Sequence, residues 1–157
     1  MLASQEYGSG QSVIILHGFL GSSDNWRGIA KNYLTNYNVH LLDLRNHGKS
    51  FHNQDISYQS MAADVDQYIE AKKIKNPIII GHSMGGKVAI QSAINKSYTI
   101  KKLIIVDIAP ITYWPHHDDV LHALKEINLT DINQISDAEN EFSKYLKDKN
   151  IRQFLIK

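Results

Sequence analysis

The sequence predicts an α/β protein in which a doubly wound, mostly parallel sheet is followed by a helical segment. Four apolar runs of strand length are rich in Ile, Val and Leu without polar alternation, which is typical of strands buried on both faces. Apolar residues at helical spacing fill the intervals between these runs, and such alternation predicts a parallel sheet with helices on both faces. The strands are expected at residues 13–16, 39–44, 78–80 and 103–106.

Three helices are expected between the strands, over residues 26–34, 58–69 and 84–93, because their apolar residues follow helical spacing. Ser57 directly precedes the second of these helices, and serine is a favoured N-cap residue. The first dozen residues are polar and contain two glycines, so we expect a loosely ordered start with at most one edge strand.

The pattern changes after residue 110, and we expect a core at 1–110 and a helical cap or lid at 111–157. One cap helix is expected around residues 120–124. A second is expected to begin at Ser136, which forms a capping-box pattern with Glu139. The apolar stripe of this second helix consists of Phe142, Tyr145 and Leu146.

Composition excludes several classes of protein. A chain of 157 residues with 43% hydrophobic and 21% charged residues is typical of one globular domain. The net charge of +1 gives no electrostatic footprint for nucleic acid, and the absence of cysteine excludes disulfides and thiolate metal sites. No apolar run approaches the ~20 residues that cross a bilayer, and the N-terminus has no secretory pattern. We therefore expect no membrane insertion and a cytoplasmic location.

The sharpest signal is a Gly-x-Ser-x-Gly motif at residues 81–85, directly after one apolar run and before a helical pattern. In this context the serine occupies a tight strand-to-helix turn with its hydroxyl beyond the sheet. Gly81 and Gly85 avoid side chains that the crowded turn could not hold, and the helix N-terminus suits a developing oxyanion. The motif predicts Ser83 as a nucleophile; the alternative is a turn whose serine caps a helix.

A second signal, Leu-His-Gly-Phe-Leu-Gly-Ser at residues 16–22, follows the first predicted strand. In proteins with this serine motif, a loop at such a position supplies the other oxyanion donor. Gly18 lets the backbone approach the site. We therefore expect the N–H groups of Phe19 and Met84 to form an oxyanion hole, and His17 to organise the loop rather than to act as a base.

A third motif, residues 42–50, also follows a strand and by itself indicates a turn with capping polar groups. Three motifs in this order, after three successive strands, resemble the α/β-hydrolase superfamily. The Arg-Asn pair at 45–46, Ser57-Tyr58 with Met61 and Asp64, and the segments 81–87 and 106–110 resemble the YbfF-type bacterial esterases. Mitochondrial hydrolases of the ABHD-eleven type are more distantly similar. The resemblance extends over almost the whole chain, from residue 13 to 155.

The resemblance implies a serine hydrolase that cleaves short acyl esters or acyl thioesters through an acyl-enzyme on Ser83. It implies an α/β-hydrolase fold with a cap over the pocket, a small-molecule substrate, and neither metal nor organic cofactor. The residues expected to contact substrate are His17, Gly18, His82, Tyr113 and Trp114.

The chain differs from the family in the position of its candidate general base. The family places it on a histidine after the last strand, whereas the histidines that follow Ser83 here lie in the segment 111–157: His116, His117 and His122. Asp107, at the end of the fourth predicted strand, is the candidate acid, with a structural role at the strand-end turn as the alternative. The chain therefore resembles the N-terminal portion of a longer hydrolase, with an incomplete fold and a weak nucleophile. Residues 103–106 are then expected at an open sheet edge, which favours self-association.

Two other functions stay open. Lyases of menaquinone synthesis share the fold, a His-Gly-Phe loop and a similar serine motif, but Asn46 and residues 106–110 favour the esterase. A catalytically inactive fragment or binding module is favoured by the missing base and opposed by the intact serine motif.

Overall fold

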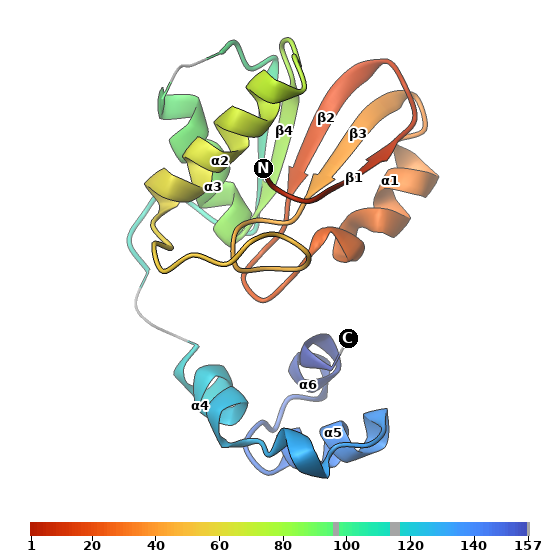
Figure 1. Cartoon of the computed structure of the whole chain (residues 1–157), viewed down its shortest axis with the longest axis vertical. Helices are drawn as coiled ribbons and strands as arrows, with labels where there is room; N and C mark the ends of the chain where they lie inside the picture. The colour runs from red at the N-terminus through yellow and green to blue at the C-terminus, as the bar shows by residue number, and fades with distance from the viewer. Residues whose placement is uncertain (96–97, 114–116, 157) are drawn as a thin grey trace. The chain divides into compact units, whose positions relative to one another are not determined.

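The computed structural model describes residues 1–95, 98–113 and 117–156 (Figure 1). The chain divides into two compact units, Met1–Pro110 and Ile111–Lys157. The first unit contains the sheet and the second is helical. The role of the second unit as a cap stays a prediction.

The first unit is built on a five-stranded sheet of order β1-β3-β2-β4-β5. The pairs β3–β2, β2–β4 and β4–β5 are parallel, and β1 runs antiparallel to β3 at one edge. The predicted mostly parallel sheet is therefore confirmed, including its N-terminal edge strand. The strands are β1 (Ser4–Tyr7), β2 (Gln11–Leu16), β3 (Tyr37–Leu42), β4 (Ile78–His82) and β5 (Lys102–Val106).

Helices cover both faces of this sheet, α2 and α3 on one face and α1 on the other (Figure 1). Successive strand residues point to opposite faces, so in β2 Val13 and Ile15 pack with Ala30 of α1, whereas Ile14 and Leu16 join the core beneath α2 and α3. The helices of this unit are α1 (Arg27–Tyr33), preceded by a 3-10 turn (Ser23–Trp26), α2 (Tyr58–Ala71) and α3 (Met84–Asn95).

The N-cap predicted for α2 is confirmed. Ser57 has an extended backbone, and its hydroxyl accepts a hydrogen bond from the Ser60 N–H. Such a cap satisfies one of the backbone donors that the first turn of a helix leaves unpaired. It fixes the residue at which the loop after β3 becomes helix α2.

Two strand predictions were wrong in detail. β3 ends at Leu42 rather than at Leu44, because the backbone N–H of Leu44 donates to the His17 ring instead of continuing a ladder. β5 is not buried on both faces: as the last strand of the sheet it leaves Leu103 and Ile104 36% and 37% exposed. The run 103–106 thus lies at an open edge in this chain, and self-association through it stays a prediction.

The second unit contains α4 (Asp118–Glu126), a 3-10 turn (Leu129–Asp131), α5 (Ile135–Ser143) and α6 (Lys149–Leu155) around the buried side chains of Ala123, Phe142 and Leu146. The helix expected to begin at Ser136 begins at Ile135. Its N-cap is Gln134, in a capping box with Asp137 rather than Glu139. Tyr145, expected on the apolar stripe, is 37% exposed beyond the end of α5. None of the helices described is long and apolar enough to cross a bilayer.

Candidate active site

Ser83 occupies the one-residue turn between β4, which ends at His82, and α3, which begins at Met84. Its φ angle is +50°, a left-handed conformation that L-residues avoid unless their surroundings impose it. Two bonds impose it here. The Ser83 N–H donates to the Val106 carbonyl at 2.9 Å, and the Ser83 carbonyl accepts from the Gly86 N–H at 2.8 Å.

Glycines allow this turn to pack against its neighbours. A Cβ at Gly81 would lie 2.4 Å from the Gly85 carbonyl oxygen, and a Cβ at Gly85 would lie 2.5 Å from the Leu16 carbonyl oxygen. Both neighbours are backbone atoms, which cannot avoid the clash by changing rotamer as a side chain could. The two glycines of the Gly-x-Ser-x-Gly motif are therefore also a steric requirement of the junction between β4, α3 and β2.

The loop after β2 lies directly beside the serine. A Cβ built on Gly18 would come within 3.4 Å of the Ser83 Cβ and 2.9 Å of His82 Nδ1. The Gly85 N–H donates to the His17 carbonyl at 3.1 Å, which fixes the start of α3 against the same loop. The structure therefore brings together four predicted site residues, His17, Gly18, His82 and Ser83.

His17 is only 1% exposed, and backbone groups bond both of its ring nitrogens. Nδ1–H donates to the Gly18 carbonyl at 2.8 Å, and Nε2 accepts from the Leu44 N–H at 3.0 Å. Burial lowers the pKa of His17 to about 4, so the ring is neutral near pH 7. These bonds join the loop after β2 to the end of β3.

A second histidine, which the sequence placed only in a structural turn, contacts the same loop. His47 accepts a hydrogen bond at Nε2 from the Leu20 N–H at 3.2 Å, and its Nδ1–H donates to the Arg45 carbonyl at 2.9 Å. Its ring lies 5.1 Å from the His17 ring and 6.1 Å from that of Phe19, measured between centroids. The available signal was a histidine just after β3, the strand that pairs with β2, whose following loop lies beside the serine.

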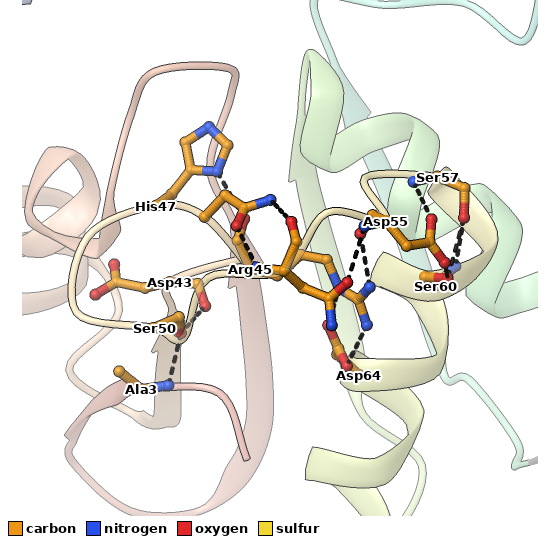
Figure 2. A network of polar contacts seen from close by, with 11 residues as sticks. Ala3, Asp43, Arg45, His47, Ser50, Asp55, Ser57, Ser60 and Asp64 are labelled. Carbon is orange, nitrogen blue, oxygen red and sulfur yellow. Dashed lines mark hydrogen bonds and ion pairs between the residues drawn. The ribbon is translucent and has the colours of Figure 1, made fainter.

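The loop that carries His47 is held by a polar network between β3 and α2 (Figure 2). Arg45 donates from Nε and Nη2 to the Asp64 carboxylate at 2.6 and 2.9 Å, and from Nη1 to the Asp55 carbonyl at 2.7 Å. The Ser60 hydroxyl bonds the Asp55 carboxylate and, with Ser57, lowers the pKa of Asp55 to about 2. The network ties the loop to the first turns of α2.

Asp107 follows β5 and also has a left-handed backbone, with φ +58°. Its carboxylate lies 3.7 Å from His82 Nε2, and the His82 ring is 6.2 Å from that of Trp26 in an edge-to-face arrangement. The Asp107 side chain is 83% exposed. The strand ends thus place this carboxylate close to the serine turn, beside His82.

The candidate residues of the segment 111–157 stay predictions. Tyr113, His117 and His122 belong to the second unit. Trp114 and His116 lie outside the described residues. Among the residues described, no cluster of three or more His, Asp or Glu side chains is placed to hold a metal ion.

The buried state of His17 predicts a specific pH dependence of stability. The unfolded chain protonates this ring near pH 6.5 and the folded chain only near pH 4. Unfolding therefore takes up a proton between these values, so the free energy of unfolding falls as the pH falls, by about 3 kcal/mol. Urea unfolding at pH 7 and pH 4.5 measures the loss.

The matched variant is His17→Gln, which cannot titrate. Its stability is expected to change less over this pH window than that of the wild type, since other groups with lowered pKa, such as His40, act in both proteins. Equal pH slopes for the two proteins would contradict the neutral, buried state of His17.

Comparison with known proteins identifies the family of the chain. Residues 11–146 match the model of the family described as alpha/beta hydrolase fold. The chain is 34% identical over 157 residues to the sn-1-specific diacylglycerol lipase ABHD11 of Danio rerio, covering 95% of this chain and 50% of the lipase. It is 31% identical over 155 residues to the esterase YbfF of Escherichia coli, covering 98% of this chain and 61% of the esterase.

A solved structure of a marine microorganism esterase superimposes with a TM-score of 0.93 at 39% identity, covering 99% of this chain and 62% of that one. The chain belongs to the α/β-hydrolase fold family, and it is similar to the family's esterases and lipases. It spans between 50% and 62% of the length of these relatives.

Proposed function

We propose that this chain carries the nucleophile and oxyanion hole of a serine hydrolase that cleaves carboxylic esters. The observation that carries the proposal is the left-handed Ser83 on a strand-to-helix turn, packed directly against Gly18 of the loop after β2. Such a backbone conformation is strained and persists where its surroundings over-determine it, which is common at active sites. The esterases and lipases among the relatives support the same reaction class.

In the proposed reaction the Ser83 Oγ attacks the ester carbonyl carbon while a base removes the hydroxyl proton. The carbonyl oxygen becomes an oxyanion, which accepts hydrogen bonds from the N–H groups of Phe19 and Met84. The intermediate collapses to an acyl-Ser83, releasing the protonated alcohol or thiol, and water then frees the acid. One such oxyanion donor contributes about 10²–10³-fold to the rate.

The base is proposed to come from outside the unit Met1–Pro110. Within that unit, backbone groups occupy both ring nitrogens of His17 and of His47. His40 bonds Tyr68 in the core. His82, whose Nε2 lies 3.7 Å from the Asp107 carboxylate, is proposed to contact substrate rather than to act as the base. Asp107 is proposed as the acid that would orient a base, since it lies at a strand end beside the serine turn.

The proposed substrates are short acyl esters or thioesters. Gly18, His82, Tyr113 and Trp114 are proposed to contact them, whereas His17, with both nitrogens bonded to the backbone, is proposed to act through the loop. The second unit is proposed to cover the pocket and to set the acyl length that fits.

Nitrophenyl esters test this function. Nitrophenyl acetate is expected to release nitrophenol faster with the wild-type chain than with Ser83→Ala, and to leave an acetyl group on the peptide that contains Ser83. Nitrophenyl octanoate then tests the acyl length. Equal release by the wild type and Ser83→Ala would contradict the proposal.

A catalytically inactive binding module is the second candidate, and the 83% exposure of the Asp107 carboxylate favours it. An acid that orients a catalytic base is usually shielded from water. Retained ester binding without any acyl-Ser83, observed by mass spectrometry, would select this candidate. A lyase on the same fold would instead eliminate without an acyl-enzyme.

A further inference from the structure

We propose that His47 is a positioning residue of the oxyanion hole, acting through the Leu20 N–H to hold the peptide that follows Phe19. The inference rests on the proposed function, because the Phe19 amide is the oxyanion donor in that function. No motif in the sequence assigns His47 this role.

Hydrogen bonds at both nitrogens fix the orientation of the His47 ring. Nε2 accepts from the Leu20 N–H, and Nδ1–H donates to the Arg45 carbonyl. Arg45 is itself held by two bonds to Asp64. The ring therefore connects the loop after β2 to Arg45, which the buried ion pair with Asp64 holds in place.

The two peptide units that flank Phe19 are held by different histidines. The Gly18 carbonyl and the Phe19 N–H belong to one planar unit, and His17 Nδ1–H bonds that carbonyl at 2.8 Å. The Leu20 N–H belongs to the next unit, which His47 bonds at 3.2 Å. With both planes held, the direction of the Phe19 N–H has little freedom left.

Leu20 shows that this loop needs such support. Its φ angle is +58°, and a left-handed conformation costs a leucine about 1–2 kcal/mol. The bond from its N–H to His47 is one restraint that holds it there, alongside the contact between the Phe19 and His47 rings. Without the acceptor, we expect Leu20 to relax and the preceding amide to turn.

The expected kinetic effect follows from the geometry. A displacement of about 1 Å in a catalytic group can cost 10²-fold in rate. Loss of the His47 acceptor, with His17 still in place, is expected to lower the rate by about tenfold without changing substrate affinity.

The experiment compares His47→Phe, which keeps a ring but no acceptor, with His47→Gln, whose amide oxygen can take the place of Nε2. The control is His52→Phe, because His52 is exposed in the same loop. The first readout is hydrogen exchange of the Leu20 amide by NMR. The second is the reaction of Ser83 with a fluorophosphonate, resolved into the maximal inactivation rate and the half-saturating concentration.

His47→Phe is expected to speed Leu20 exchange at least tenfold and to slow maximal inactivation about tenfold, with the half-saturating concentration within twofold. His47→Gln is expected to restore both, and His52→Phe to change neither. Unchanged Leu20 exchange in His47→Phe would overturn the inference and leave the proposed function intact. Fast exchange with an unchanged inactivation rate would also overturn it. If the fluorophosphonate never modifies Ser83 in the wild type, the proposed function fails, and the positioning role with it.

Discussion

Gly85→Ala is expected to destabilise the first unit by about 3 kcal/mol or more. The added Cβ would lie 2.5 and 2.6 Å from the carbonyl oxygens of Leu16 and His17, at the end of the central strand β2. Neither oxygen can move without disturbing the sheet, and the bond from the Gly85 N–H to the His17 carbonyl would lengthen as well. Overpacking of a close-packed core costs about 1–3 kcal/mol even where side chains can adjust.

Gly28→Ala is the matched control for this substitution. Gly28 lies in α1, and a Cβ there meets no atom within 4 Å. Since glycine inside a helix is less stable than alanine by about 0.5–1 kcal/mol, this variant is expected to be slightly more stable than the wild type. Urea unfolding measures both. A midpoint for Gly85→Ala close to that of the wild type would contradict the packing described for the serine turn.

Arg45→Met is expected to cost about 3–5 kcal/mol at pH 7, because it leaves the Asp64 carboxylate buried without its partner. The two side chains are only 10% and 9% exposed, and two hydrogen bonds join them. The guanidinium also holds the Asp55 carbonyl, so the loop before α2 loses an anchor. Thermal and urea unfolding measure the change.

Two further variants separate the ion pair from the shape of the side chains. The double variant Arg45→Met, Asp64→Leu removes both charges and is expected to be more stable than Arg45→Met alone. Arg27→Met breaks a pair with Asp24 whose side chains are 52% and 57% exposed. This exposed pair is expected to contribute less than about 1 kcal/mol. A similar loss of stability for Arg45→Met and Arg27→Met would show that the buried pair contributes no more to stability than the exposed pair.

The sheet and its flanking helices could be predicted from the sequence because their signals are local. The apolar runs of β2 and β4 and the helical spacing of α2 reflect burial on defined faces, and Ser57 fulfils its expected capping role. The end of β3 could not be predicted, since it depends on His17, which lies 27 residues away in the chain. The place of β5 at the edge of the sheet was expected from the resemblance, whereas its apolar composition predicted burial on both faces, which was wrong.

In the candidate site, too, the local motifs could be predicted and the long-range contacts could not. The serine motif and the loop at Gly18 have fixed local spacing, and the structure places them side by side. The contribution of His47 depends on a hydrogen bond across 27 residues, so a reading of residues 42–50 alone could indicate only a turn. In the second unit, the Gln134 cap was missed because serine, a more favoured N-cap residue, lies two positions later. Helix α6 was missed because it has only seven residues.

A nucleophilic Ser83 on a strained turn beside an oxyanion hole should react with a fluorophosphonate in the folded chain, and peptide mass spectrometry would locate the adduct. We expect one adduct, on Ser83, that is absent from the Ser83→Ala variant. A natively folded chain with no adduct on Ser83, or with equal total labelling in Ser83→Ala, would contradict this expectation.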